Sequence, residues 1–280
     1  MTACNFLRFL VWLLLFGAPS AYAAGPVQAK HAQVELISQP LISQQPAFGS
    51  GRLLGVHFVM EKGWHIYWVN PGDSGQPPAF KWQLPLGLVA GEIQWPRPER
   101  MQSSPQLADY GYHDDVVLLV PLRELPTWNP GALLNVTIRL DARWLICREV
   151  CLPDQAHLEL SLPQKSGPDA ATEKLFSRAL RLVPKPLPGG WKAGVESRQD
   201  EFVLSIRAKK SLSAAQFFPL EPSQIDNAAA QKVEPVAKGA RITLKRSDEL
   251  LKPITVLRGI LVLPGDDAYR VEAPVAPAKK

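Results

Sequence analysis

The sequence predicts an all-β protein made of two antiparallel β-sandwich domains, which a short helix and a proline-rich linker join. Short segments rich in β-branched and aromatic residues recur along most of the chain. Gly, Pro or Ser residues bound these segments, as is typical of strands. The 27 prolines among 280 residues also suit strands broken by turns better than long helices. One clear helical pattern lies between the two groups of strands.

The first 23 residues have the pattern of a secretory signal peptide. Arg8 precedes an apolar run at residues 9–16, and Ala21-Tyr22-Ala23 fits the small-x-small rule for cleavage. The apolar run is short for an uncleaved membrane anchor, and no later stretch approaches 18 uninterrupted apolar residues. We therefore expect residues 1–23 to be removed and the rest of the chain to have no transmembrane segment. Secretion would place it in an oxidising space where disulfides persist.

The first predicted domain covers residues 24–165. Its strands are expected from segments of high β propensity that end at turn-forming residues. In the last of them, Leu158, Leu160 and Leu162 alternate with other residues, which puts all three on one face. The expected strands are 34–37, 52–60, 65–69, 116–120, 133–140 and 156–162.

Residues 166–190 are expected to form the helix and the linker. Asp169 can cap a helix at 170–183, and the proline-rich stretch 184–190 would end it. Basic residues occupy one side of this helix, so contact with a membrane is one interpretation. A single apolar stripe more often packs on the protein's own domain, which we favour. The stripe consists of Leu175, Phe176, Ala179, Leu180 and Val183.

The second predicted domain covers residues 191–275 and contains no cysteine. Its composition again favours short strands bounded by turns. The Pro- and Ala-rich end that starts at Pro274 is expected to be disordered, and we assign residues 276–280 to the tail. The expected strands are 191–195, 201–207, 241–245, 254–257, 259–263 and 268–272.

The formal net charge gives little indication of a partner. Loss of residues 1–23 lowers it from +5 to +4, because Arg8 is the charged residue of that segment. The remaining excess is mild and spread along the chain. It weakly favours an acidic partner and offers no case for binding of nucleic acid.

The stretch WLICREVCLP at 144–153 holds two of the three cysteines, Cys147 and Cys151. The third, Cys4, would leave with the signal peptide. In an extended strand, residues four apart are separated by about 13 Å, beyond the reach of a disulfide. A bridge therefore requires a turn or one helical turn across residues 148–150, with Pro153 ending it. Such a tight bridge is expected to be exposed and labile.

Four interpretations of this pair can be compared, and no cofactor is expected. A structural zinc site needs about four ligands, and His157 is the nearest additional candidate. Two thiolates could bind copper(I), although Met60 and Met101 lie outside any methionine-rich motif. A purely structural disulfide would remove little chain entropy across so short a loop. A redox-active pair is the remaining interpretation.

Several motifs resemble one family of proteins. WLICREVCLP resembles the signature of the periplasmic N-terminal region of DsbD/ScsB-type thiol–disulfide interchange proteins. The resemblance extends over most of the chain after the signal peptide, through the stretches GWHIYWVNPGD at 63–73, WPRP at 95–98, YGY at 110–112 and FFPLEP at 217–222.

The resemblance implies an immunoglobulin-like fold and a periplasmic protein-disulfide reductase or thiol–disulfide oxidoreductase. The cysteine pair would take electrons from a membrane electron transporter of the DsbD type. It would pass them to periplasmic thioredoxin-fold proteins. Family members with the complete pathway continue into a membrane domain and a thioredoxin-like domain, whereas this sequence stops at Lys280. Either a separate polypeptide supplies the electrons, or this copy serves another purpose.

The resemblance also implies roles for individual residues. Cys147 and Cys151 would be the catalytic pair, with Cys151 as the nucleophile that partners engage and Cys147 as the resolving cysteine. Aromatic and acidic side chains from two loops would shield the disulfide. By position these are Trp64, Tyr67, Asp109 and Tyr110, although Trp64 and Tyr67 are equally compatible with the sandwich core. Copper binding and an inert disulfide remain alternatives.

Overall fold

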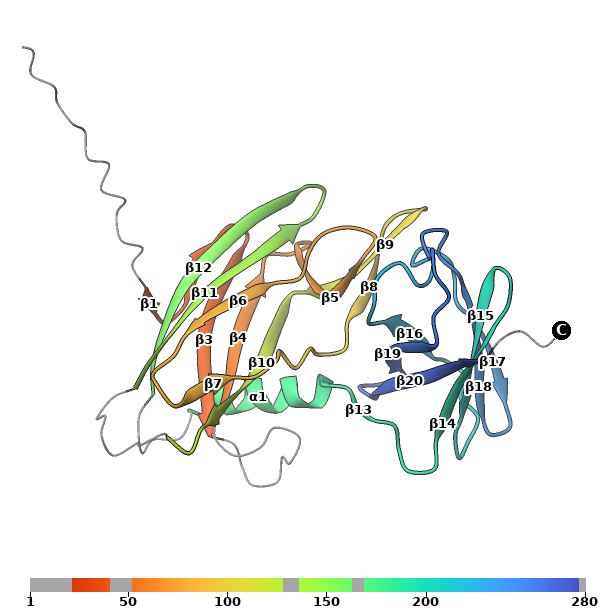
Figure 1. The fold of residues 1–280 in the computed structure, drawn as a ribbon. Helices are drawn as coiled ribbons and strands as arrows, with labels where there is room; N and C mark the ends of the chain where they lie inside the picture. Colours follow the sequence, from red (N-terminus) through yellow and green to blue (C-terminus); the bar gives the residue numbers. More distant parts are fainter. Residues whose placement is uncertain (1–21, 41–51, 128–135, 163–168, 277–280) are drawn as a thin grey trace, which may run out of the picture.

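The computed structural model describes residues 22–40, 52–127, 136–162 and 169–276. Two β-sandwiches stand side by side, and a helix lies under the first of them (Figure 1). Cys4 and nearly all of the predicted signal peptide lie outside the described residues.

The larger sheet of the first sandwich carries both cysteines. Its strand order is β1-β12-β11-β5-β9-β8, and β6 pairs with another part of β11. Neighbouring strands are antiparallel, apart from the two-residue β1, which pairs in parallel with β12. The strands are β1 (Ala23–Ala24), β5 (His65–Gly72), β6 (Ala79–Gln83), β8 (Glu99–Ser104), β9 (Leu107–His113), β11 (Val136–Cys147) and β12 (Cys151–Leu162).

The smaller sheet of the first sandwich is fully antiparallel, in the order β2-β3-β4-β10-β7. Alternate residues of both sheets point inward and form one core, which includes Val56, Leu118, Ile138 and Leu158. This is the packing expected of two sheets with one apolar face each. The strands are β2 (Val27–Ala29), β3 (Ala32–Pro40), β4 (Arg52–Met60), β7 (Leu88–Ala90) and β10 (Asp115–Glu124).

The helix α1 (Ala170–Leu182) confirms the predicted helix and its cap. The Asp169 carboxylate accepts a hydrogen bond from the Thr172 amide. Phe176 and Ala179 are buried against the outer side of the smaller sheet, so the helix packs on its own protein. Among the described residues, no helix is both long and apolar enough to cross a membrane. The whole predicted apolar stripe contributes to the contact between α1 and the smaller sheet: Leu175, Phe176, Ala179, Leu180 and Val183.

The second sandwich is built from one continuous path of strands, β16-β19-β20-β14-β15-β18-β17. A short parallel pairing of β14 with β20 joins its two layers, and β13 also pairs in parallel with β20. The strands are β13 (Lys185–Pro186), β14 (Lys192–Ser197), β15 (Glu201–Arg207), β16 (Gln216–Pro219), β17 (Lys232–Val236), β18 (Gly239–Lys245), β19 (Val256–Val262) and β20 (Ala268–Ala276).

The two sandwiches share apolar contacts. Phe218 and Ile260 of the second sandwich are buried in the core cluster of the first. The Phe218 ring meets the rings of Tyr110 and Trp68 edge to face, at centroid distances of 5.1 and 6.3 Å. Edge-to-face packing of buried aromatic rings is favourable. The interface is therefore a continuation of the first core.

The all-β, immunoglobulin-like fold with two antiparallel sandwiches is confirmed, and β19 and β20 differ from the strands expected there. The expected strands at 254–257 and 259–263 are one strand, β19. Gly259 lies inside this strand and does not end it. The position has no room for a side chain, since a Cβ there would lie 2.3 Å from the Phe217 ring. β20 continues to Ala276, because its end pairs with β14 through Val275. The expectation of disorder from Pro274 onwards was therefore wrong for residues 274–276.

Candidate functional site

The two cysteines close the hairpin of β11 and β12. Cys147 is the last residue of β11, Cys151 is the first of β12, and the two are register partners. Their Cα atoms are 4.2 Å apart and a disulfide joins them. The expected turn at 148–150 is present as a hairpin turn and not a helical one. Pro153 belongs to β12, where it pairs with Leu145, so it does not end the turn.

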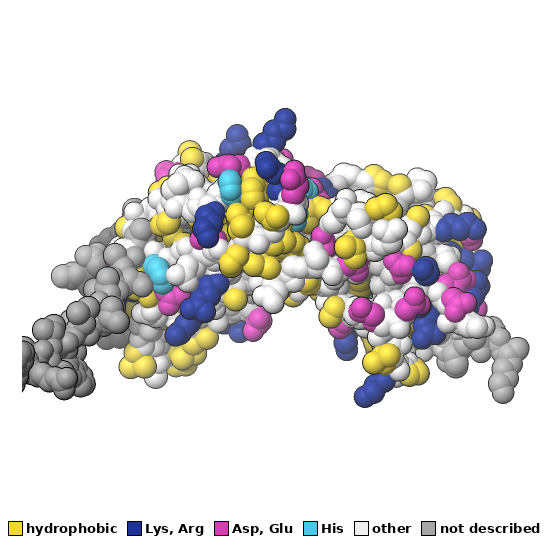
Figure 2. All heavy atoms as spheres, turned by 90° about the horizontal axis from the view of Figure 1, so that it is seen from above, with side chains coloured by type: hydrophobic (Ala, Val, Ile, Leu, Met, Phe, Trp, Pro, Cys, Tyr) yellow, Lys and Arg dark blue, Asp and Glu magenta, His cyan; other side chains and the backbone are white. Residues whose placement is uncertain are grey.

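The two sulfur-bearing residues differ in exposure. Cys147 is only 2% exposed, because β5 flanks it on the other side and His65 is its register partner there. Cys151 is exposed, and so is its neighbour Val150, at 61%. Figure 2 looks down on the upper end of the molecule and shows hydrophobic side chains gathered near the middle of this face, between charged ones. One cysteine is thus accessible to another protein and the other is not.

The disulfide lies on the outer face of the larger sheet. Along β11 the even-numbered residues, from Val136 to Ile146, are buried in the core, and the odd-numbered ones point outward. Cys147 follows the outward set, as do Tyr67 and His65 on β5, whose rings contact each other edge to face at 5.2 Å. This strand periodicity of two decides which side chains can reach the disulfide.

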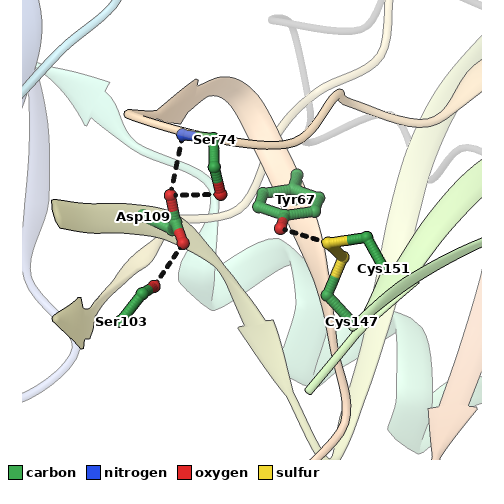
Figure 3. Close-up of a disulfide and its surroundings, with 6 residues drawn as sticks. All are labelled: Tyr67, Ser74, Ser103, Asp109, Cys147 and Cys151. Carbon is green, nitrogen blue, oxygen red and sulfur yellow. Dashed lines mark hydrogen bonds between the residues drawn. A yellow bond between two sulfur atoms is a disulfide. The ribbon is translucent and has the colours of Figure 1, made fainter. Parts of the chain in front are cut away.

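Tyr67 makes the direct contact with the disulfide. Its hydroxyl oxygen lies 3.3 Å from the Cys151 Sγ (Figure 3). A disulfide sulfur carries no hydrogen, so the tyrosine is the donor. Burial is the main cause that raises the pKa of Tyr67 above its usual value, which keeps the hydroxyl protonated at neutral pH. Tyr67 can therefore serve as a permanent hydrogen-bond donor to this sulfur.

Asp109 lies on the same face but binds the surrounding chain and not the disulfide. Its Oδ1 accepts hydrogen bonds from the backbone amide and the hydroxyl of Ser74, both at 2.9 Å. Its Oδ2 accepts a short hydrogen bond from the Ser103 hydroxyl (Figure 3). The carboxylate is 2% exposed, and these three donors satisfy it. Asp109 thus ties β9 to the segment that follows β5.

Residues 73–78, which we call the covering segment, connect β5 with β6. Gly75 lies directly against the Tyr67 ring, since a Cβ at this position would be 2.1 Å from a ring carbon. Its φ angle of 76° is also one that glycine adopts readily. A side chain at residue 75 would push the segment or the tyrosine away. The covering segment therefore holds the Tyr67 ring in place.

Trp64 and Tyr110, which the family resemblance assigned to the shield, are part of the core. Tyr110 is 1% exposed, on the opposite face of β9 from Asp109, and its hydroxyl bonds to Asn227. Trp64 stacks on His31 with the ring planes 6° apart, and the Arg148 guanidinium lies 5.2 Å from its ring. Tyr110 points away from the outer face because of the strand alternation, and Trp64, which directly precedes β5, is buried in the same core cluster. Asp109 and Tyr110, which were expected in a loop, belong to the strand β9, and Tyr67 belongs to β5, which includes the expected strand 65–69.

His65 is the residue near the disulfide that the sequence analysis did not single out. It is 7% exposed, and its Nε2 has no hydrogen-bond partner within the described structure. Burial, and to a lesser extent the nearby His113, lower its pKa to about 4, against a weaker opposite influence of Asp109. His65 is thus neutral at neutral pH. Its place two residues before Tyr67 in a strand could have identified it.

A surface groove of about 610 Å³ lies between the β11–β12 hairpin and the covering segment. Leu145 and Pro153, the pair two positions from the cysteines, line it together with Gln76 and Pro77 of the covering segment. Arg143 also lines this groove, whereas Arg148 is turned to Trp64. The groove places mixed polar and apolar surface beside the disulfide.

The alternative metal ligands are not assembled in the part of the chain that the structure describes. His157 bonds through Nδ1 to the Asp141 carboxylate at 2.7 Å, well along the hairpin from the cysteines. No group of three or more His, Cys, Asp or Glu residues in the described ranges has an arrangement that could hold a metal ion.

Comparison with known proteins relates this site to a family. Residues 38–163, which include the hairpin, Tyr67 and Asp109, match the family model described as thiol:disulfide interchange protein DsbD, N-terminal. The match to the DsbD N-terminal family thus covers the part of the chain that holds the site. This part is a thiol:disulfide interchange domain that carries the Cys147–Cys151 disulfide.

The structure is also similar to the crystal structure of the N-terminal periplasmic domain of ScsB from Proteus mirabilis. The TM-score is 0.64 at 17% sequence identity, and the match covers 88% of this chain and 94% of that chain. The likeness therefore extends to the two-sandwich fold as a whole. No curated protein sequence matches the chain at a significant level.

Proposed function

We propose that the protein is a periplasmic thiol–disulfide interchange protein. In this proposal the Cys147–Cys151 pair carries electrons from a membrane transporter of the DsbD type to periplasmic thioredoxin-fold proteins. The observation that carries the proposal is the bond between one exposed and one buried cysteine, in a segment that matches the DsbD N-terminal family. The periplasmic location rests on the predicted signal peptide and on the similarity to a periplasmic domain of ScsB.

The first step begins from the reduced dithiol. The Cys151 thiolate attacks one sulfur of the acceptor's disulfide. A bond forms between the two proteins, and the acceptor's other sulfur leaves as a thiolate. Cys151 suits this step because it is exposed. The Tyr67 hydroxyl would donate a hydrogen bond to the thiolate and so lower the pKa of the Cys151 thiol.

The second step releases the acceptor. The Cys147 thiolate attacks the Cys151 sulfur, the Cys147–Cys151 disulfide forms, and the acceptor leaves with both of its cysteines reduced. This attack is intramolecular, so Cys147 does not need to be exposed. Two electrons have then passed to the acceptor. The membrane transporter would return two electrons to the disulfide and complete the cycle.

Trapping of the mixed disulfide tests this division of roles. The Cys147→Ala variant should accumulate a covalent complex with an oxidised, purified thioredoxin-fold disulfide isomerase, because no resolving thiol remains. The Cys151→Ala variant should trap little, since its remaining thiol is buried. Non-reducing electrophoresis measures both. Equal trapping by the two variants would contradict the roles assigned to the cysteines.

The alternatives make different predictions for the same protein. If neither variant traps a partner, a redox titration of the wild-type protein separates the remaining cases. An inert structural disulfide should resist reduction at glutathione potentials. A copper(I) site should appear as stoichiometric binding of the metal to the reduced protein and should disappear in both cysteine variants.

A further inference from the structure

The second sandwich presents one buried asparagine to the covering segment. Asn227 is 5% exposed. Its Nδ2 donates a hydrogen bond of 2.7 Å to the Asp73 carboxylate, across a sequence separation of 154 residues. Its Oδ1 accepts a hydrogen bond of 2.9 Å from the Tyr110 hydroxyl. The amide thus binds the first sandwich at its core and at the start of the segment that holds Tyr67.

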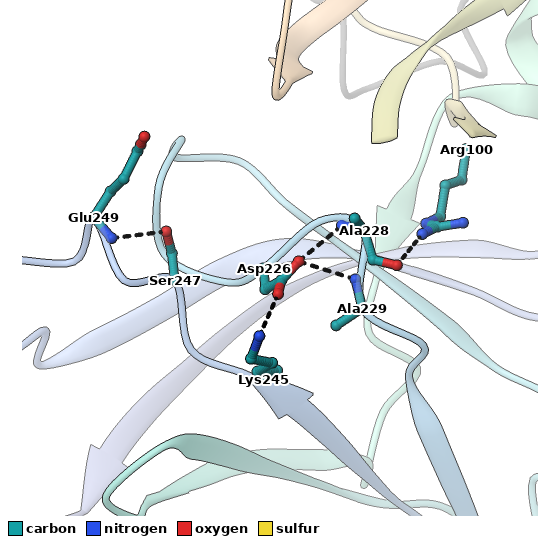
Figure 4. Close-up of polar contacts among 7 residues, drawn as sticks. All are labelled: Arg100, Asp226, Ala228, Ala229, Lys245, Ser247 and Glu249. Carbon is teal, nitrogen blue, oxygen red and sulfur yellow. Dashed lines mark hydrogen bonds and ion pairs between the residues drawn. The ribbon is translucent and has the colours of Figure 1, made fainter. Parts of the chain in front are cut away.

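The loop that carries Asn227 is held from both sandwiches. Within the second, the Asp226 carboxylate accepts hydrogen bonds from the amides of Ala228 and Ala229 at 3.1 and 3.0 Å and from Lys245 at 2.8 Å (Figure 4). From the first, the Arg100 guanidinium donates to the carbonyl oxygens of Asn227 at 3.0 Å and Ala228 at 2.7 Å. These bonds fix the direction of the Asn227 side chain.

Asp73, the first residue of the covering segment, links Asn227 to that segment. Besides Asn227, its carboxylate accepts a hydrogen bond of 2.8 Å from the Ala108 amide in β9. Two residues later, Gly75 presses on the Tyr67 ring, whose hydroxyl contacts the Cys151 sulfur. A continuous series of contacts therefore leads from the second sandwich to the disulfide.

We propose that Asn227 is a positioning residue for the redox site. Through it, the second sandwich keeps the covering segment closed on Tyr67 and keeps the Tyr67 hydroxyl on Cys151. The proposal rests on the interchange function proposed above and gives the cysteine-free sandwich a part in it. Hydrogen bonds to charged groups are stronger than neutral ones, so loss of the Asn227–Asp73 bond should open the segment more often.

The test is the rate at which a water-soluble phosphine reduces the disulfide of the folded protein. Asn227→Asp keeps the size of the side chain and the acceptor for Tyr110. It removes the donor and places a negative charge opposite Asp73. This variant should be reduced faster than wild type by a factor of about 5 or more, the size expected for loss of one such bond. Asn227→Ala should show a smaller increase.

Two further variants separate positioning from general stability. Asp73→Ala removes the acceptor at an exposed residue, so it should fold, and its disulfide should also be reduced faster. Asp266→Ala removes the exposed ion pair with Arg97, which joins the two sandwiches away from the covering segment. That control should lose a little thermal stability and keep the wild-type reduction rate. All rates are measured well below the unfolding transitions.

The outcomes are distinct. Wild-type rates in both Asn227→Asp and Asp73→Ala would overturn the positioning role. An equal acceleration in Asp266→Ala would overturn it as well, because a loosened interface would then explain the result. The phosphine needs no protein partner. Failure of mixed-disulfide trapping would therefore count against the proposed function without affecting this measurement.

Discussion

The two faces of β5 and β9 carry similar side chains with different tasks. On the inner face, Trp68 and Tyr110 are 1% exposed and pack against each other and against the second sandwich. On the outer face, Tyr67 is equally buried, yet its cover is a loop segment and its hydroxyl reaches the disulfide. Burial alone thus does not tell a core aromatic residue from a site aromatic residue. The difference lies in what covers each ring.

This comparison predicts that substitutions of the inner-face aromatic residues change mainly stability, whereas substitution of Tyr67, which touches the disulfide, changes mainly the chemistry of the sulfurs. A sheet packs its inner face against a second layer at close to crystal density, so a cavity there is expensive. At Tyr67 the outer face is covered by one short segment, which can shift when a side chain beneath it is altered, so the loss of stability should be smaller. Three experiments can break or sharpen this contrast.

The largest expected effect comes from the inner face. Trp68→Ala should lower the free energy of unfolding by about 3–5 kcal/mol, because it leaves a large cavity between Tyr110 and Phe218. Denaturant titration of the oxidised protein measures the loss. Below the transition, the phosphine should reduce the disulfide at the wild-type rate. A faster reduction in the folded variant would mean that the two faces are coupled.

A smaller effect should come from His65 as the pH changes. Its pKa is about 4 in the folded protein and about 6.5 in the unfolded chain. Between these values the unfolded chain binds a proton that the folded protein does not. The free energy of unfolding should therefore fall as the pH drops from about 6.5 to about 4, by about 2 kcal/mol after allowance for solvent screening.

His65→Gln supplies the control for that pH dependence. Glutamine does not titrate in this range, so the variant should lose most of the decline in stability between pH 6.5 and 4. Other groups on this face, such as His113 and Asp109, are unchanged. If the variant shows the same decline as wild type, His65 is not its source. Thermal unfolding at a series of pH values provides the measurement.

The smallest effect on stability is expected for Tyr67→Phe, which removes one hydroxyl and keeps the ring under Gly75. The free energy of unfolding should change by less than about 1 kcal/mol. The chemistry should change more. In the Cys147→Ala background, the pH midpoint for alkylation of Cys151 by iodoacetamide should rise by about one unit, because the thiolate loses a hydrogen bond. An unchanged midpoint would remove Tyr67 from the mechanism.

Strands with strong apolar patterns were predictable, whereas weakly patterned ones were not. β4 and β15 have the predicted bounds, and the helix α1 starts after its predicted cap. β6 and β17 were missed, because they are short and largely exposed and therefore lack an apolar run. In the site, Tyr67 was correctly brought near the disulfide. Tyr110 was not, because adjacent strand residues point to opposite faces.

Local chemistry along the chain determined several features of this protein. Three of these features are local: the alternation in β12, the apolar stripe of α1 and the tight turn between Cys147 and Cys151. Each involves residues that are close together in the sequence. Such features depend on spacing, which the printed sequence contains. The same holds for the short motifs that resemble the DsbD family.

Only the tertiary structure decided which side chains surround the disulfide. A shift of one residue in strand register would exchange the two faces of β5, and nothing local to 63–73 sets that register. The approach of Gly75 to Tyr67 depends on the path of a loop. The bond from Asn227 to Asp73 depends on how the two sandwiches meet, because these residues are 154 positions apart in the chain. These contacts come from packing between distant segments, which residue spacing does not encode.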